Sequence, residues 1–484
     1  MSLEAVLVGA AALLIASVLS SRLSGLLGVP ALLFFLAVGM LAGTDGPGGF
    51  EFQNYPLAFA IGSVSLGLIL FDGGMRTRWD NVRPVLRSGV SLATVGVVVT
   101  ALATALFARY AFDLSWLAAI LVGAIVSSTD AAAVFSVLRS RNLSLKGRLK
   151  QLLEFEAGSN DPMAILLTIG ALSVATGEAN GPVELTHLFL AQAVLGLALG
   201  WAGGKAIAWV INRAGIEYEG LYSVLLLACV LLLFGGTSAL GGSAFLAVYV
   251  AGIVVGNSDL LHKLSLLKFH DGIAWIAQIM LFLTLGLLVT PSELPLLWQE
   301  GLLLALFLML VARPLSVLAA APTLVHHWRE WLFVSWVGLR GGAPIVLATL
   351  PYTAGLPNAE SVFHLVFFVV LVTVLAQGSS IAWLARALGL VTPLPPEPDY
   401  FAGLLPPGFV SVEITVQPGA PAEDRRLFEL GLPSGVLLTS VEREDRFLVP
   451  GGETRFLAND RIRALARASN LTQLNNTFGA VRET

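Results

Sequence analysis

Long apolar runs, separated by glycine, proline or clusters of charge, make up most of the chain. Runs of roughly 18 to 25 residues have the length that a helix needs to cross a bilayer. By that rule the pattern predicts about thirteen membrane spans, the shorter ones with the least defined ends. The predicted spans cover residues 3–20, 29–43, 56–71, 85–108, 114–138, 151–176, 185–211, 220–235, 241–257, 271–290, 298–320, 331–351 and 362–388.

The pattern changes after Leu390, where prolines become frequent and period-two alternation replaces the long apolar runs. The stretch 410–416 alternates as a half-buried strand does, and further strands are predicted near 435–441, at 447–449 and after Asn459-Asp460. We therefore expect three parts: a transmembrane domain (1–390), a stiff Pro-rich linker (391–408) and a small cytosolic α+β domain (409–484). The last part is expected to cap, regulate or dimerise the first.

The loops between the predicted spans differ in their content of Lys and Arg. One alternate set carries nearly all of these residues, and the other set offers only Arg109. Because basic residues favour the cytoplasmic side, we expect a multi-pass protein of a bacterial inner membrane with its N-terminus outside and its C-terminus in the cytoplasm. The basic loops contain Arg22, Arg76, Arg78, Arg83, Arg87, Arg139, Arg141, Lys146, Arg148, Lys150, Lys205, Arg213, Lys263, Lys268 and Arg329.

Composition supports a membrane protein and excludes several other classes. The 484 residues are 56% hydrophobic and 12% charged, with mean hydropathy +0.81. A net charge of -4 without a basic stripe argues against nucleic acid as a partner. The single Cys229 allows neither an intrachain disulfide nor a cysteine metal cage. The N-terminus lacks a basic region ahead of its apolar run, so we expect a retained span rather than a removed signal peptide.

A few charged side chains fall inside the predicted spans, where each costs roughly 2.5 to 3.5 kcal/mol and needs a partner or a function. Three of them, Asp72, Glu154 and Arg313, are predicted to lie near span ends, within reach of water. The full set is Asp72, Asp130, Glu154, Glu156, Asp161, Arg313 and Arg340.

The densest polar stretch inside a span runs from Glu154 to Pro162. On a helix, Glu156 and Asn160 share a face, whereas Asp161 points elsewhere. Pro162 leaves a backbone carbonyl without its helical donor. A carboxylate beside carbonyl and amide oxygens suits a hard cation or a proton in a water-filled cavity. The alternative for Asp161 is an ion pair that only locks helices together.

Two spans contain residues that break or cap helices at membrane depth. One break is Ser127-Ser128-Thr129-Asp130, and the other is Leu339-Arg340-Gly341-Gly342-Ala343-Pro344. They lie seven spans apart and so run in opposite directions, as inverted repeats with a midplane binding site require. Asp130 can cap one half-helix, and Arg340 can serve a carbonyl end or pair with Glu156. Simple Gly/Pro kinks are the alternative.

Other functions are less well supported by the residues. A cation channel could use the same buried acid. An intramembrane serine protease could be built from Gly241-Gly242-Ser243 with His364 as base, but small residues are ordinary in packed membrane helices. An aspartyl protease lacks its second G-x-G-D aspartate, and no Walker loop for an ATP-driven pump is present.

The motifs just described resemble the NhaP-type branch of the monovalent cation:proton antiporter superfamily. The resembling segments are Glu156 to Pro162, Thr129-Asp130-Ala-Ala-Ala-Val-Phe135 and Gly338-Leu-Arg-Gly-Gly-Ala-Pro344. The resemblance covers nearly the whole chain. It is strongest to potassium/proton antiporters with a C-terminal TrkA-C domain, the C-lobe of RCK modules, whose turns resemble Gly431-Leu-Pro-Ser-Gly435, Val449-Pro450-Gly451 and Asn459-Asp460.

This resemblance implies an all-α polytopic fold with crossed, discontinuous helices, assembled as a homodimer in the lipid bilayer. It implies no enzyme activity and no cofactor, and exchange of K⁺ or Na⁺ for H⁺. A nucleotide or other ligand of the tail domain stays open.

The resemblance also assigns roles to single residues. Asp161 would bind cation and proton in turn, with Asn160 and Thr129 as support, and Asn160 in place of a second aspartate matches the electroneutral branch. Asp72 matches an acidic position at the cytoplasmic entrance. Glu156 and Arg340 match a structural ion pair. Ala157 stands where the family usually has Ser, which leaves the choice between K⁺ and Na⁺ open.

Overall fold

The computed structural model describes residues 2–27, 29–179, 181–322, 327–393, 409–443 and 446–483. The chain divides into two compact units, Met1–Pro393 and Leu394–Thr484. Most of the predicted Pro-rich linker, residues 394–408, lies outside the described residues.

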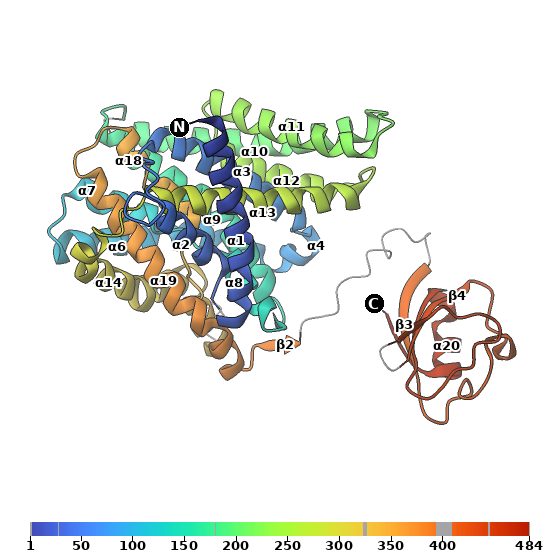
Figure 1. Cartoon of the computed structure of the whole chain (residues 1–484). Coiled ribbons are helices and arrows are strands. Elements are labelled where there is room, and N and C mark those ends of the chain that lie inside the picture. The colour runs from blue at the N-terminus through green and yellow to red at the C-terminus, as the bar shows by residue number, and fades with distance from the viewer. Residues whose placement is uncertain are drawn as a thin grey trace. The chain divides into compact units, whose positions relative to one another are not determined.

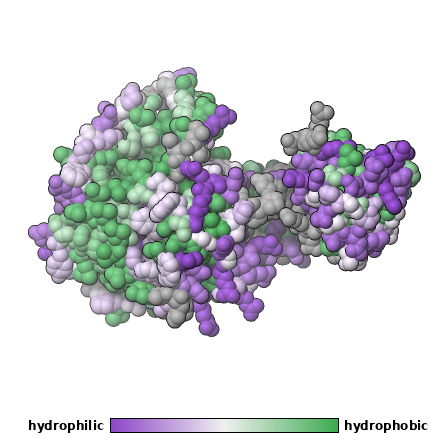
Figure 2. Space-filling model, turned by 90° about the horizontal axis from the view of Figure 1, so that it is seen from below, coloured by the Kyte–Doolittle hydropathy of each residue, from purple (hydrophilic) through white to green (hydrophobic). Residues whose placement is uncertain are grey.

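The larger unit is a bundle of helices (Figure 1). Among the described residues, eight helices are long and apolar enough to cross a membrane. The surface of this unit is broadly hydrophobic in Figure 2, as lipid contact requires. The α-helices are α1 (Leu3–Leu27), α2 (Ala31–Ala42), α3 (Tyr55–Arg76), α4 (Trp79–Val82), α5 (Leu86–Ser91), α6 (Val97–Ala111), α7 (Trp116–Ile125), α8 (Ala131–Ser140), α9 (Leu149–Ala175), α10 (Pro182–Arg213), α11 (Glu219–Ala239), α12 (Ala244–Gly256), α13 (Lys263–Leu288), α14 (Trp298–Phe307), α15 (Arg313–Ala320), α16 (Trp328–Trp336), α17 (Gly342–Leu347), α18 (Leu350–Thr353) and α19 (Ala359–Ala387).

Glycines bring pairs of these helices into close backbone contact. A Cβ on Gly286 of α13 would lie 2.9 Å from the Cα of Gly39 in α2, and one on Gly252 of α12 would lie 3.1 Å from the Cα of Gly74 in α3. Small residues at crossings allow such packing between membrane helices, where burial away from water supplies no driving force. Because Gly62 of α3 also faces Leu281 of α13, the helices α2, α3, α12 and α13 form one packed group.

Two membrane segments are interrupted at the places that the sequence predicts. Helix α7 ends at Ile125 and α8 begins at Ala131, and α16 ends at Trp336 before α17 begins at Gly342. The two unwound stretches meet, since the backbone N–H of Asp130 donates to the carbonyl of Leu339 at 2.8 Å. These breaks are therefore crossed connections between half-helices rather than isolated kinks.

Two short strands pair in a place where the sequence predicts no sheet. Strand β1 (Leu143–Leu145), between α8 and α9, pairs antiparallel with β2 (Val391–Pro393), just after α19. The N–H of Lys146 also donates to the carbonyl of Leu390 at 2.8 Å. The first residues of the predicted linker are thereby hydrogen-bonded to the loop that joins α8 to α9.

The smaller unit contains a five-stranded antiparallel sheet in the order β5-β4-β6-β3-β7, with one short helix. The strands predicted from alternation are confirmed as β3, β4, β5 and β6, while helix α20 and strand β7 are additional. Asp460 is 1% exposed, and both of its carboxylate oxygens accept bonds from Arg443, at 2.8 and 2.7 Å. The elements are β3 (Phe409–Val416), β4 (Val436–Arg443), β5 (Arg446–Leu448), β6 (Arg461–Arg467), α20 (Leu471–Phe478) and β7 (Gly479–Glu483).

Candidate ion-binding site

A small cavity of about 50 Å³, lined by both polar and apolar residues, lies where the two interrupted segments meet α3, α9 and α13. Three of the predicted site residues, Thr129, Asp130 and Asp161, line it together. Ser128 and Gln278 line it as well, and they were missed as site residues although each is a polar residue inside an apolar span. The full lining is Leu66, Ile69, Ser128, Thr129, Asp130, Ala132, Asp161, Gln278, Leu281, Phe282, Gly341, Gly342, Ala343 and Pro344.

Helix α9 presents Asn160 and Asp161 to different surroundings, as the helical spacing predicts. Asn160 is 1% exposed and donates through its Nδ2 to the Oγ1 of Thr129 at 2.5 Å. Asp161 is only partly buried, because its side chain borders the cavity. The helix continues through Pro162 without interruption. The carboxylate is thus accessible to an ion, while the neighbouring amide fixes the unwound stretch beside it.

Asp130 caps one half-helix at the edge of the cavity. Its side chain accepts from the N–H of Ala133 at 3.1 Å, at the positive end of the α8 dipole. The other unwound stretch approaches so closely that any Cβ at position 341 would collide with the Asp130 side chain. Glycine at that position is therefore a condition for the crossing.

Arg340 does not form the predicted ion pair with Glu156. Its Nη1 donates to the carbonyls of Ser127 and Ser128, at 3.0 and 2.5 Å, and the residue is fully buried. Because the stretch after α7 is unwound, these carbonyls have no N–H donor from a helix, and the guanidinium donates to them instead. Arg340 thus takes the other predicted role, at a carbonyl end.

Glu156 pairs instead with Arg313. The two hydrogen bonds are parallel, with Nη1 to Oε1 at 2.6 Å and Nη2 to Oε2 at 3.0 Å, and both residues are at most 3% exposed. The expectation that water solvates Arg313 at a span end is wrong, because the Arg313 side chain is buried beside Gly338 and next to the second break. The pair joins α9 to α15.

Asp72 does not line the cavity. It is 8% exposed, near the C-terminal end of α3, and its Oδ2 accepts from Arg76 at 2.8 Å. Arg76 also contacts Asp271 of α13 at 2.5 Å. The Asp72 carboxylate therefore belongs to a charged network at one end of the helices, separate from the lining of the cavity.

The alternative of a serine protease receives no support from the contacts of its residues. Ser243 accepts from the N–H of Leu246 at 3.5 Å and so caps α12. His364 faces Glu293, with 3.1 Å between Nδ1 and Oε2. Each residue has another partner.

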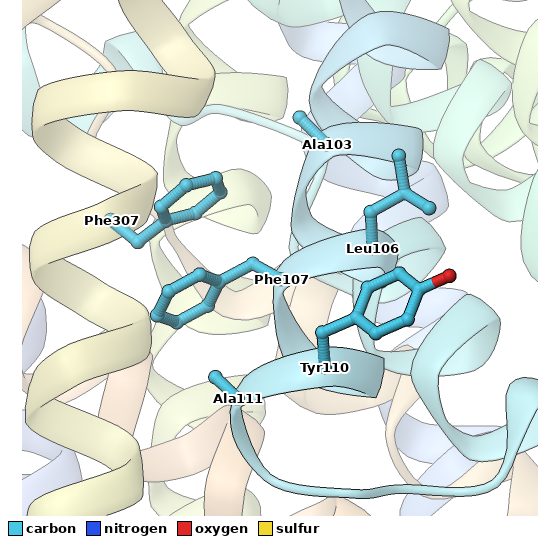
Figure 3. Close-up of a pocket in the computed structure, with 6 residues that line it drawn as sticks. All are labelled: Ala103, Leu106, Phe107, Tyr110, Ala111 and Phe307. Atoms are coloured by element: carbon cyan, nitrogen blue, oxygen red, sulfur yellow. The ribbon is translucent and has the colours of Figure 1, made fainter.

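A larger pocket, of about 570 Å³, lies on the surface of α6 and α14 (Figure 3). Phe107 and Phe307 stack there with ring centroids 4.1 Å apart. The lining offers no charged side chain that could hold an ion, and Tyr110 is 76% exposed. This pocket suits lipid contact rather than ion binding.

Comparisons with known proteins agree with this arrangement. Residues 10–387 match the family described as "Sodium/hydrogen exchanger, transmembrane", and residues 412–479 match the TrkA-C domain. The chain is 42% identical over 477 residues to the K(+)/H(+) antiporter NhaP2 of Shewanella sp. strain MR-4, covering 97% of this chain and 82% of the relative. It is 38% identical to the K(+)/H(+) antiporter NhaP of Alkalimonas amylolytica, with the same coverage.

A solved structure shares the fold of the larger unit. The sodium proton antiporter MjNhaP1 of Methanocaldococcus jannaschii at pH 8 superposes with a TM-score of 0.70 at 22% identity, over 80% of this chain and 99% of that chain. The helical architecture, the match over most of the chain and the close relatives identify a transporter rather than an enzyme. The chain belongs to the sodium/hydrogen exchanger family and is a cation/proton antiporter with a C-terminal TrkA-C domain.

Proposed function

We propose that the protein exchanges K⁺, Na⁺ or both for H⁺ without moving net charge, by alternating access at Asp161. The observation that carries the proposal is the position of Asp161, with four other polar residues, at a small cavity between two crossed, interrupted segments. A carboxylate there can hold either a cation or a proton. If only the occupied forms change between inward-facing and outward-facing states, the two fluxes are coupled without another energy source.

The polar groups around Asp161 support its proposed role. Thr129, held by Asn160, offers a hydroxyl oxygen, and Ser128 and Gln278 add oxygens suited to a monovalent cation. One carboxylate that exchanges one monovalent ion for one proton moves no net charge. Asp130 is engaged as a helix cap and is proposed to shape the site. Asp72 is proposed to attract cations at the cytoplasmic entrance.

We also propose that the two halves of the membrane domain are inverted repeats with thirteen crossings in all. The eight long helices, together with α2, α9, α12 and the interrupted pairs α7/α8 and α16/α17, give that number. A turn of π-helix interrupts the segment before each break, at Leu92–Gly96 and at Leu308–Ala312. Matching irregularities in matching segments are typical of such repeats.

The remaining parts of the proposal concern assembly and placement. The protein is proposed to act as a homodimer in a bacterial inner membrane, with its N-terminus outside. Its domains are proposed to span 1–390, 391–408 and 409–484, with the last regulating transport, whatever its ligand. The ion that is carried is proposed to be K⁺, because the 42% identical relative is named a K(+)/H(+) antiporter. Na⁺ remains the second candidate, because a 27% identical relative from Aphanothece halophytica is named a Na(+)/H(+) antiporter.

Transport by purified protein in liposomes tests this function. Addition of K⁺ or Na⁺ on one side should drive protons to that side across a range of pH, and the two ions should reveal the preference. On solid-supported membranes the same gradients should give no current. Cation flux without proton movement would instead identify a channel, and a current that reverses with the cation gradient would contradict one-for-one exchange.

A further inference from the structure

Three side chains with metal-binding atoms meet away from the cavity at Asp161. They are Glu293, in the loop between α13 and α14, and Glu360 and His364, on the first turns of α19. One ligand atom from each lies within 4.8 Å of the others, and the Nδ1 of His364 is 3.1 Å from the Oε2 of Glu293. None of the three lines the cavity at Asp161.

The burial of these side chains suits a site that an ion can enter from water. The His364 side chain is 4% exposed, whereas that of Glu293 is 41% exposed and Glu360 lies at the surface. The Nε2 of His364 is buried and has no hydrogen-bond partner among the described residues. The imidazole is thus a buried ligand beside one partly exposed and one exposed carboxylate.

The ligand atoms of Glu293, Glu360 and His364 indicate which class of metal ion the site would bind. One imidazole with two carboxylates suits Zn²⁺ and similar divalent ions, whereas K⁺, Na⁺ and Mg²⁺ prefer oxygen ligands alone. Zinc takes such ligands at about 2.0 to 2.2 Å in a tetrahedron, which sets them roughly 3.3 Å apart. Metal binding would require the three ligand atoms, which now lie within 4.8 Å of one another, to move to that spacing, and water could fill the fourth position.

The cluster joins two parts of the helical bundle. The loop that carries Glu293 is tied to the loop after α2, since the N–H and Oγ of Ser292 donate to the Oδ2 of Asp45 at 3.0 and 2.5 Å. His364 and Glu360 belong to α19. Tyr55 of α3 also stacks on Tyr352 of α18, with ring centroids 3.7 Å apart, and lies edge-on to Phe363, the neighbour of His364 in α19.

We propose that Glu293, Glu360 and His364 bind a divalent transition-metal ion such as Zn²⁺, and that the bound ion holds α19 against the loop after α13. Binding itself depends only on the cluster. Its effect on transport rests on the proposed alternating access, because an ion that bridges two parts of the bundle slows any motion between them. In the proposed orientation the cluster faces the outside.

Binding is tested on the purified full chain by thermal unfolding and calorimetry with Zn²⁺ alone. Zn²⁺ should raise the melting temperature saturably, and His364→Gln and Glu360→Gln should each weaken its affinity at least tenfold. His187→Gln and Glu178→Gln, which remove exposed groups outside the cluster, should leave the affinity unchanged. Equal affinity in all five proteins, or no binding by the wild type, would overturn the site and leave only a histidine–carboxylate contact. Because Glu360 is exposed, its variant remains informative if the His364 variant fails to fold.

Transport in liposomes then separates the site from the proposed function. External Zn²⁺ should inhibit exchange by the wild type and by His187→Gln, with relief by a chelator, and should leave Glu360→Gln active. Binding without inhibition would overturn the restraint on α19. Absence of cation-driven proton flux before any Zn²⁺ is added would instead count against the proposed function, while the melting experiment would still decide the binding site.

Discussion

Glu156 and Arg313 form two parallel hydrogen bonds, of 2.6 and 3.0 Å, with both side chains at most 4% exposed. The pair connects α9, one residue of which is Asp161, to α15 beside the second helix break. Removing one partner of such a buried pair destabilises the protein more than replacing both, because the remaining charge is left uncompensated.

We therefore expect Glu156→Ala and Arg313→Ala each to lower the free energy of unfolding by about 3 to 5 kcal/mol. The double variant should lose less than the sum of the two, since neither charge is then left alone. Thermal melting in detergent measures the differences. Strictly additive losses would contradict the pairing. It would also be contradicted if a double-mutant cycle of Glu156 with Arg340 gave the same coupling energy as the cycle with Arg313.

Arg340→Gln should lower the rate of exchange strongly and the melting temperature only a little. The shorter amide cannot supply the carbonyls of both Ser127 and Ser128, which the unwound stretch leaves without helical donors. Proton flux and melting temperature are measured on the same preparation, with Arg329→Gln, at an exposed position, as the control. Unchanged flux in a folded Arg340→Gln protein would show that the guanidinium is not needed at the crossing.

Gly341→Ala should strongly reduce exchange, because the added Cβ collides with the side chain of Asp130. Gly272→Ala is the matched control, since a Cβ at Gly272 of α13 meets open space and alanine favours a helix. Flux in liposomes compares the two. Similar activity in both variants would mean that the crossing has more room than the structure gives it.

Two truncations that differ by three residues should behave differently. A chain that ends at Pro393 keeps strand β2 paired with β1, next to α8 and α9, whereas one that ends at Leu390 loses that pairing. If the tail regulates transport, the longer chain should stay active with an altered pH or ligand dependence. The shorter chain should be less active, because the loop between α8 and α9 loses its pairing with β2 and keeps only the bond from Lys146 to Leu390. Equal transport rates in the two truncated chains would show that the pairing of β2 with β1 is not needed for transport.

The sequence predicts those features that depend on local chemistry. Helix breakers and caps at Thr129-Asp130 and at Gly341-Gly342 locate the interruptions, and helical spacing separates Asp161 from Glu156. The choice of ion-pair partner could not be predicted in the same way. Arg313 and Arg340 both lie in spans, but which one faces Glu156 depends on how three helices rotate and cross. The pairing of β1 with β2 was also missed, because three-residue strands far apart in sequence carry no periodic signal.

Exchange by the Asp161→Asn variant shows whether cation and proton share this one carboxylate. The amide keeps the shape of the side chain but can neither release a proton nor offer a full negative charge to a cation. Asp113→Asn, at a side chain that is 94% exposed, serves as the control. After a K⁺ or Na⁺ pulse to liposomes, we expect wild-type proton flux for Asp113→Asn and none above protein-free liposomes for a folded Asp161→Asn protein. Substantial cation-driven proton flux through Asp161→Asn would contradict this expectation.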